Sequence, residues 1–241
     1  MAPKSKKIEI SEERTVEIVS VVAHQLKTPI SVIKGYLEAL MSGDCGKVTP
    51  AQKEYLSDAL ENIKRIFDFI DTLLEVSRIE DKKLSIKLGP VDLGKVTTKV
   101  LKNFSHWIEA NNCEVVFKKP EKLPKVLTDP VRIYQVVQNF IANAVVYKEG
   151  RGRVEIKLKQ KGNNVLFICK DNGFGVPKKD FRKIFSKFHR SAKAMNLDPS
   201  GSGLGLFINK AVIELNKGKI WFEKNKGKGM TFYFSLPIKK S

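Results

Sequence analysis

The sequence of 241 residues lacks a long hydrophobic run. Apolar segments such as residues 165–169 (VLFIC) are far shorter than the roughly 20 residues that a membrane-spanning helix needs. The first seven residues (MAPKSKK) are basic but precede no apolar stretch, so we predict no secretory signal. The sequence therefore predicts a chain without a membrane segment.

Cysteine is also scarce. The three cysteines, Cys45, Cys113 and Cys169, are widely spaced and form no CxxC pair. This excludes a disulfide framework and the common zinc-site spacings, and it favours a cytoplasmic location. Glycine, proline and serine are not in excess, which excludes fibrous and disordered classes. The length allows one large globular domain or two ordinary ones.

The two parts of the chain differ in charge. Residues 1–83 contain 13 Lys and Arg against 14 Asp and Glu, whereas residues 84–241 contain 31 against 12. A strongly basic segment would attract a polyanion, such as a nucleotide triphosphate or DNA, or an acidic protein surface. The alternative interpretation is a lysine-rich, solvated surface without a partner.

The first third of the chain has apolar residues at helical spacing. The first seam, with steps of three and four, consists of Val16, Val19, Ala23, Leu26, Ile30, Ile33, Leu37 and Leu40. The second consists of Leu56, Ala59, Ile63, Ile66, Ile70 and Leu73, flanked by Leu60, Phe67 and Leu74. This repeat predicts two amphipathic helices with broad apolar faces.

A glycine-containing break, residues 42–47 (SGDCGK), separates the two helices. Thr49, Pro50 and Gln52 follow it, and they match an N-cap, a first-turn proline and a capping-box partner. The segment is therefore predicted to be a helical hairpin. Since two helices cannot cover their own broad apolar faces, we predict a homodimer that forms a four-helix bundle. The alternative is that the apolar stripe packs on the second half of the chain.

A domain boundary is predicted near Leu84, where alternating apolar residues replace the helical spacing and Gly89 and Pro90 then break the pattern. The predicted domains are residues 1–83 and 84–241. The second is expected to contain helices at 93–110, 130–146 and 207–215 and strands at 113–117, 125–127, 153–159, 164–170, 219–224 and 230–236. The fold class is therefore α+β: an antiparallel helical hairpin, then an α/β sandwich of one sheet layered on helices.

His24 is the first candidate for chemistry. It follows the seam residue Ala23, which places it on the flank of the apolar stripe. Pro29 inside the helix frees the carbonyl of Gln25 at a cost of about 3 kcal/mol, and such a cost suggests a function. A reachable neutral imidazole is a good nucleophile near pH 7. The alternative is a surface histidine beside an incidental kink.

Two polar clusters could bind a metal-nucleotide complex. Asn139 and Asn143 share one helix face, and amide groups can ligate Mg²⁺ or donate to phosphate. Asp171 follows a strand and precedes Gly173 and Gly175, so its carboxylate could accept an adenine amino group where glycine lets the backbone approach. Helix-contact capping and an ordinary turn are the simpler alternatives.

A third cluster is the glycine-rich segment 201–206 (GSGLGL), which opens a predicted helix. Backbone N–H groups at such a helix start can bind phosphate. The segment lacks the Lys-Ser/Thr ending of a P-loop and does not fit a dinucleotide-binding βαβ unit.

Five segments, in this order, resemble the sensor histidine kinase family. They are AHQLKTPI (23–30), QNFIANAVVY (138–147), DNGFGVP (171–177), IFSKFHR (184–190) with GSGLGL (201–206), and GKGMTF (227–232). The resemblance extends over residues 12–237. It implies a dimerisation and phosphotransfer hairpin joined to a Bergerat-type ATP-binding domain, with ATP and Mg²⁺ as ligands and a response regulator receiver domain as partner.

The resemblance also implies roles for individual residues. His24 would be the phosphoacceptor, Thr28 would position water for dephosphorylation of the regulator, and Asn143 would ligate Mg²⁺. Asp171 would bind the adenine amino group, while Phe185 and Phe188 would anchor a lid at about 189–200. The implied nucleotide site contains Asn139, Asn143, Tyr147, Asp171, Gly173, Gly175, Phe188, Gly201, Gly203, Leu204, Gly205 and Thr231.

The sequence departs from the family pattern at two positions. Gln25 stands where the family usually has an acidic residue that orients the imidazole and acts as a base. Val146 stands where a basic residue is common in the family. Either Lys148 replaces that residue, or the affinity for phosphate is lower.

We therefore expect a histidine kinase with phosphatase activity, in which Gln25 belongs to the catalytic set with His24 and Thr28. The alternative is a regulator-binding phosphatase with weak kinase activity. A DNA-associated ATPase would leave the hairpin unexplained, so we predict no nucleic-acid partner.

Overall fold

The computed structural model describes residues 12–239, without the side chains of residues 12–18 and 20. The basic start of the chain, residues 1–7, therefore lies outside the described residues. The backbone of the seam residue Val16 is described, but its side chain is not. The chain forms two compact units, Met1–Leu84 and Ser85–Ser241. No helix within residues 12–239 is long and apolar enough to cross a membrane.

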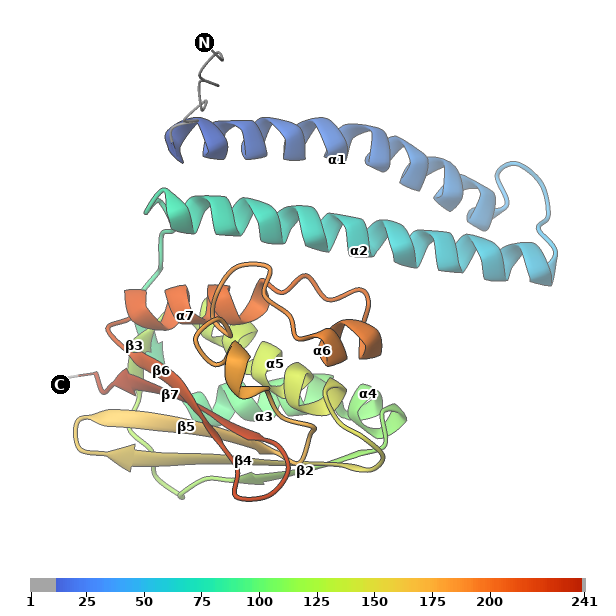
Figure 1. The fold of residues 1–241 in the computed structure, drawn as a ribbon. Coiled ribbons are helices and arrows are strands. Elements are labelled where there is room, and N and C mark those ends of the chain that lie inside the picture. Colours follow the sequence, from blue (N-terminus) through green and yellow to red (C-terminus); the bar gives the residue numbers. More distant parts are fainter. Residues whose placement is uncertain (1–11, 240–241) are drawn as a thin grey trace, which may run out of the picture. The chain divides into compact units, whose positions relative to one another are not determined.

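The first unit is a helical hairpin of α1 (Glu12–Ser42) and α2 (Pro50–Glu80), as Figure 1 shows. The capping box at the start of α2 is present. The Thr49 hydroxyl accepts the Gln52 N–H at 3.2 Å, and the Gln52 side chain accepts the Thr49 N–H at 2.8 Å. These reciprocal bonds satisfy two backbone donors that the first turn would otherwise leave free, so the predicted start of this helix is confirmed.

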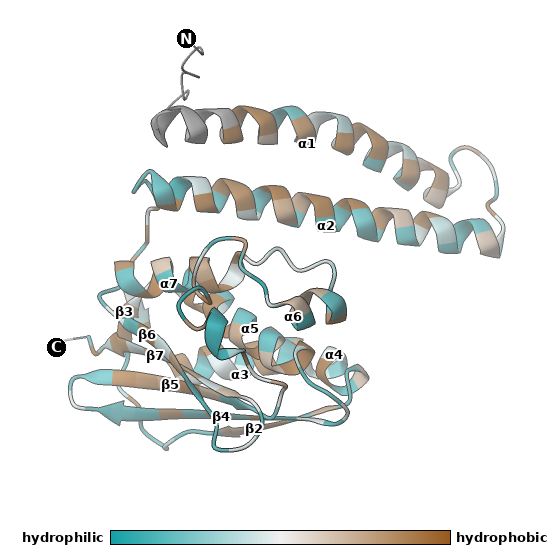
Figure 2. Cartoon of the chain, viewed as in Figure 1, coloured by the Kyte–Doolittle hydropathy of each residue, from teal (hydrophilic) through white to brown (hydrophobic). Residues whose placement is uncertain are grey.

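Figure 2 shows apolar residues recurring along both helices. Some residues of each seam are buried and others are partly exposed. On α1, Ala23 is buried whereas Leu26 and Ile33 expose 47% and 52% of their surface. On α2, Ile63 and Ile70 are buried. One hairpin therefore covers only part of its apolar surface, as the breadth of the stripes predicted.

The second unit contains a five-stranded sheet in the order β2-β4-β5-β7-β6 and a two-stranded sheet of β1 and β3. Strands β2 and β4 are parallel and the other neighbours are antiparallel. The strands are β1 (Gly89–Val91), β2 (Cys113–Lys118), β3 (Val126–Thr128), β4 (Gly152–Lys161), β5 (Asn164–Asp171), β6 (Lys219–Lys224) and β7 (Met230–Pro237). The helices are α3 (Leu93–Asn103), α4 (Ser105–Ala110), α5 (Pro130–Val146), η1 (Lys178–Asp180), α6 (Ala192–Leu197) and α7 (Gly205–Leu215).

Helices α3, α5 and α7 lie on one side of the five-stranded sheet (Figure 1). Strand β4 alternates between buried apolar residues such as Ile156 and charged residues that are half-buried or exposed, because successive side chains point to opposite faces. Phe140 of α5 stacks on Phe167 and Phe234 of the sheet at centroid distances of 6.1 and 6.0 Å. This core joins α5 to the sheet, and the predicted architecture is confirmed.

The predicted helix 93–110 is wrong in one respect, because it is broken at Phe104. The backbone of Phe104 has φ −100° and ψ 2°, outside the helical region, and α4 starts at the next residue. The Phe104 ring packs edge-on against Trp107 at 5.4 Å. Neither glycine nor proline marks this break, so the sequence contained no local signal for it.

Candidate functional site

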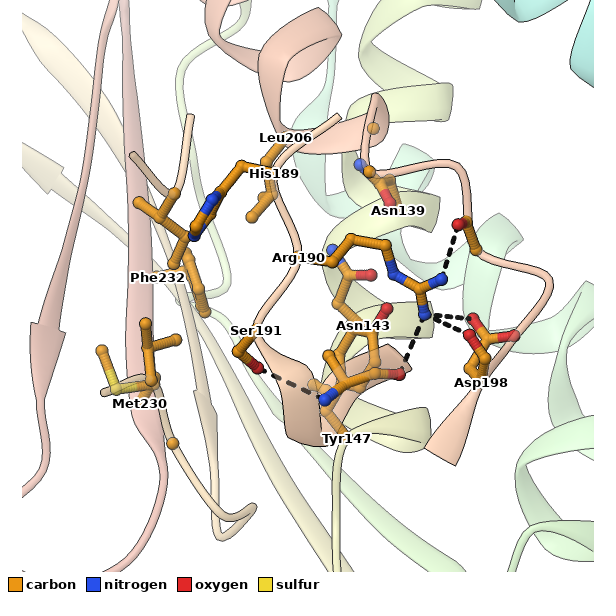
Figure 3. A pocket seen from close by; sticks show the side chains of 18 of the residues that line it. Asn139, Asn143, Tyr147, His189, Arg190, Ser191, Asp198, Leu206, Met230 and Phe232 are labelled. Atoms are coloured by element: carbon orange, nitrogen blue, oxygen red, sulfur yellow. Dashed lines mark hydrogen bonds and ion pairs between the residues drawn. The ribbon is translucent and has the colours of Figure 1, made fainter. Parts of the chain in front are cut away.

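A cavity of about 280 Å³ lies in the second unit. Residues from α5, the end of β5, segment 184–206 and β7 line it (Figure 3). Its lining includes eight residues of the expected nucleotide site: Asn139, Asn143, Tyr147, Asp171, Gly175, Gly201, Gly203 and Gly205. The tertiary structure thus brings together residues that are more than sixty positions apart in the sequence.

The two asparagines of α5 lie one helical turn apart and both face the cavity (Figure 3). The Asn139 amide nitrogen is buried without a hydrogen-bond partner among the described residues. A Cβ on residue 205 would lie 2.5 Å from this nitrogen, so only glycine lets α7 begin so close to Asn139. An unpaired donor beside the N-terminus of an 11-residue helix is suited to an anion.

Asp171, at the end of β5, supplies a carboxylate at another part of the cavity. Its Oδ1 atom accepts N–H bonds from Gly173 at 2.8 Å and Met230 at 3.1 Å. Burial raises the pKa of Asp171, and the two N–H bonds only partly oppose that rise. Since both bonds go to Oδ1, the Oδ2 atom is available to a donor on a ligand.

Arg190 organises segment 189–203, which we expected to contain a lid. Its guanidinium donates to the carbonyls of Ala194 at 2.9 Å and Gly201 at 2.7 Å, and also to that of Asp198. The side chain of Asp198 is an ion-pair partner at 3.8 Å. The Arg190 Nε atom is buried and has no partner among the described residues, so one more donor remains beside the cavity.

Helix α6 of the same segment is held to two other loops by Lys193. The Lys193 ammonium forms an ion pair with Glu149, which follows α5. It also lies 4.8 Å from the centre of the Phe174 ring, which lines the cavity. These contacts connect segment 189–203 to the loops that follow α5 and β5.

Four residues of the expected site do not line the cavity. Gly173 and Thr231 are buried beside Asp171, and Leu204 is fully buried in the core. Phe188 is 59% exposed. Lys148, considered as a substitute for the missing basic residue, donates to the Gly150 carbonyl at 3.2 Å and also lies outside the lining.

Several lining residues were not assigned an individual role from the sequence. They include His189, Arg190, Ser191, Asp198, Met230 and Phe232 (Figure 3). The first four of these lie within the lid expected at about 189–200. Met230 and Phe232 belong to the GKGMTF segment, and Arg190 ends IFSKFHR, so their positions within motifs were the available signal. His189 lies 3.6 Å from the Asp180 carboxylate, a contact that no sequence spacing indicates.

The other expected residues belong to the first unit, on α1. His24 is exposed beside the buried Ala23, as predicted, and Gln25 is exposed as well. The Thr28 hydroxyl donates to the His24 carbonyl at 3.3 Å. Lys27 forms an ion pair with Asp71 of α2, which ties the two helices together next to His24.

Two family models match the chain. Residues 15–82 match the His Kinase A (phospho-acceptor) domain, and residues 128–240 match the histidine kinase-, DNA gyrase B- and HSP90-like ATPase domain. The chain belongs to the sensor histidine kinase family of two-component systems. The matched ranges place His24 in the phospho-acceptor domain and the cavity in the ATPase domain.

Curated relatives agree with this family. The chain is 33% identical to the sensor protein kinase WalK of Staphylococcus saprophyticus, over 95% of this chain and 37% of that protein. It is 32% identical to a WalK of Staphylococcus aureus, over 95% of this chain and 55% of that protein. The chain thus spans between about a third and just over half of these relatives.

Solved structures of kinases share the fold. Full-length ShkA in complex with AMPPNP superposes with a TM-score of 0.77 at 24% identity, covering 93% of this chain and 46% of ShkA. The nucleotide-free catalytic domain of ThkA superposes with a TM-score of 0.57 at 26% identity, covering 64% of this chain and 99% of that domain. The likeness to ShkA extends to the combination of a helical hairpin with an α/β domain.

Proposed function

We propose that this chain is an ATP:protein-histidine phosphotransferase, with residues 1–83 as the dimerisation and phosphotransfer domain and residues 84–241 as the ATP-binding domain. The observation that carries the proposal is the cavity in which the Asn139 and Asn143 amides, the Asp171 carboxylate and a glycine-rich helix start face a common space. ShkA binds the ATP analogue AMPPNP, which supports a nucleotide as the ligand here. A cytoplasmic location would give this site access to ATP.

The donors in the cavity fit a triphosphate. Within residues 12–239 the Asn139 amide nitrogen and the Arg190 Nε atom are buried without partners, and the N–H groups at the start of α7 lie beside Asn139. Phosphate oxygens would satisfy these donors. Asp171 would accept the amino group of the adenine through Oδ2.

Mg²⁺ fits the same site, because it is commonly bound by one or two protein oxygens together with phosphate oxygens. Asn143 would supply the amide oxygen, and the ion would neutralise charge on the transferred phosphoryl group. Among the described residues there is no cluster of three His, Cys, Asp or Glu side chains, so the phosphates themselves would complete the coordination.

His24 would supply the nucleophile. A ring nitrogen of the neutral imidazole attacks the γ-phosphorus, a nitrogen–phosphorus bond forms, and the bond to the β,γ-bridging oxygen breaks with release of ADP. Neighbouring Gln25 can hydrogen-bond to the ring but cannot accept its proton. The phosphoryl group would then pass to an aspartate of a response regulator receiver domain.

A homodimer fits the apolar surface of the hairpin. Three residues at every second position of the α1 seam, Leu26, Ile33 and Leu40, are 38% to 52% exposed. Pairing two hairpins in a four-helix bundle would cover this row. Sedimentation should give a dimer at tens of micromolar, and a monomer there would contradict the proposal.

The test of kinase activity is labelling with ATP that carries radioactive γ-phosphate. Wild type should acquire an acid-labile, base-stable label, as expected for phosphohistidine. His24→Ala should acquire none while retaining nucleotide binding, and Asp171→Asn should bind the nucleotide at least about tenfold more weakly and acquire less label. An acid-stable label, or labelling of His24→Ala, would refute the assignment.

A second candidate function is dephosphorylation of the regulator, with ATP as an allosteric ligand. Gln25 favours it, because an amide cannot serve as a general base for attack by His24. The exposed Thr28 hydroxyl lies one turn after His24, where it could position a water molecule. Incubation of a phosphorylated regulator with wild type and Thr28→Ala would separate the two functions. Phosphatase activity without measurable autophosphorylation would favour this second function.

A further inference from the structure

The Asn225 side chain makes four hydrogen bonds within and beyond its hairpin turn. It lies between β6 and β7, and its amide nitrogen donates to the carbonyls of Asp171 at 2.8 Å, Lys228 at 3.2 Å and Met230 at 3.3 Å. Its amide oxygen accepts the Thr231 hydroxyl at 2.6 Å. Both ends of this side chain are therefore engaged, and one bond reaches 54 residues along the sequence.

These bonds hold the turn against the end of β5. A Cβ on residue 229 would lie 2.1 Å from the Asp171 carbonyl oxygen, so the two backbones are in direct contact there. Directly after this contact, the Met230 N–H reaches the Asp171 Oδ1 atom. Asn225 thus donates to the Asp171 main-chain carbonyl, while the Met230 N–H at the end of the same turn donates to the Asp171 carboxylate.

We infer that Asn225 is a positioning residue for Asp171, and that it directs Oδ2 toward the exocyclic amino group of a purine. The inference rests on the proposed function, since it takes the cavity as a nucleotide site. A carboxylate has a broad range of terminal torsion angles, so its direction must come from bonds to its oxygens. Gly173 supplies one such bond from the local turn, and the Met230 N–H supplies the other only while Asn225 keeps the turn in place.

Thr231 belongs to the same set of hydrogen bonds. The family resemblance implied that it belongs to the nucleotide site, and the structure places its hydroxyl on Asn225 rather than in the cavity lining. Its effect on the nucleotide would therefore pass through Asn225 and the turn. Hydrogen bonds from Thr231 to Asn225 and from Asn225 to Asp171 thus connect the last hairpin to the residue that bears the base-binding carboxylate.

The experiment compares two ligands that differ only in the amino group, ATP and purine riboside 5′-triphosphate, on the full chain. One hydrogen bond to a charged group corresponds to roughly a tenfold to hundredfold preference, so wild type should bind ATP at least about tenfold tighter. In Asn225→Ala the preference should fall to about threefold or less. Asn225→Asp, which keeps the shape but loses both amide donors, should behave the same way.

Asn216→Ala is the matched control. Asn216 is also a buried asparagine of the second unit, and its amide donates to the Val212 carbonyl at 2.7 Å at the end of α7. The Asn216→Ala substitution should lower thermal stability while leaving the preference for ATP unchanged. If Asn225→Ala does not fold, Asn225→Asp and Thr231→Val provide the same measurement.

Two outcomes are distinguishable. An Asn225 variant that binds both triphosphates more weakly but keeps the wild-type preference would overturn the inference, because the residue would then be only structural. Wild type that binds neither triphosphate would instead refute the proposed function.

Discussion

The carbonyl oxygen of Tyr147 lies 2.2 Å from the point that a Cβ atom on residue 173 would occupy. Gly173→Ala must therefore push the end of α5 away from the loop after β5. We expect a loss of about 1–3 kcal/mol in the free energy of unfolding, typical of overpacking. We also expect at least a tenfold loss of ATP affinity, because the Gly173 N–H holds the Asp171 carboxylate.

Chemical unfolding and nucleotide titration would measure the two effects. Gly227→Ala is the control, because a Cβ there meets nothing within 4 Å and the substitution lies in the nearby β6–β7 turn. Equal unfolding free energies and equal ATP affinities of the two variants would show that the close approach of Gly173 to Tyr147 affects neither stability nor nucleotide binding.

The raised pKa of Asp171 predicts a pH dependence of nucleotide binding. Burial favours the protonated carboxyl, which cannot accept a second donor as well as the carboxylate does. ATP affinity should therefore be highest above this raised pKa and fall as the pH drops through it. Purine riboside 5′-triphosphate shares the phosphate titration but lacks the amino group, so its affinity should show a smaller fall.

Asp171 also affects stability, with a defined sign. A carboxyl whose pKa is higher in the folded than in the unfolded chain binds protons more tightly when folded, so its contribution falls as the pH rises between the two pKa values. Asp171→Asn should remove this decrease and unfold at a higher temperature than wild type at pH 7. A lower unfolding temperature at pH 7 would contradict the prediction.

Asp129 should have the opposite pH dependence. Burial alone would raise its pKa, but N–H bonds from Lys87 at 2.8 Å, Val131 at 2.9 Å and Arg132 at 3.1 Å outweigh burial and lower the pKa. The stability it contributes is therefore present above the ordinary pKa of aspartate and is lost as the pH falls through the lowered one.

Asp129→Ala removes the N-cap of α5 and the anchor of the segment that precedes β1. We expect a loss of about 1–2 kcal/mol at pH 7 that shrinks on acidification, measured by urea unfolding. Asp92→Ala, at the N-cap of α3, removes a cap with one bond, from Lys95 at 3.0 Å, and should cost less. A loss of stability in Asp129→Ala that is independent of pH would contradict the lowered pKa of Asp129.

The contacts of Lys193 predict an effect on the rate of nucleotide entry. The hydrogen bond and charge of Lys193 hold the pKa of Glu149 below its ordinary value. Glu149→Gln should release helix α6 and raise the association rate of a fluorescent ATP analogue about twofold at low salt. Above 0.5 M salt the difference should disappear, since exposed charges are then screened. Equal association rates at low salt would show that this pair does not restrain the segment.

Gln25 predicts slow autophosphorylation. Assistance by a general base is worth about 10²–10⁴-fold, so Gln25→Glu should label His24 faster by at least about tenfold. Single-turnover labelling at saturating ATP measures the chemical step, and unchanged ATP affinity would be the internal control. Equal rates for wild type and Gln25→Glu would show that an acidic neighbour is not what limits the reaction.

Much of the fold followed from patterns between residues close in sequence. The capping box of Thr49 and Gln52 and the start of α5 at Pro130 involve contacts within one helical turn, so a single sequence contains them. The break at Phe104 was missed because its edge-on contact with Trp107 leaves no mark in composition. Within the site, motif order indicated Asn139, Asn143 and Asp171, whereas Arg190 and Asn225 had no assigned role.

Helix periodicity, capping residues and alternating strands were readable from the chain itself, because these interactions join residues a few positions apart. Three-dimensional packing alone determined that Arg190 binds the carbonyls of its own segment, that Lys193 meets Glu149, and that Asn225 grips Asp171. The last two of these contacts join residues 44 and 54 positions apart, so each depends on a loop closing over many residues. Spacing along the chain cannot encode such a closure, since it depends on how the whole sheet and its covering helices pack.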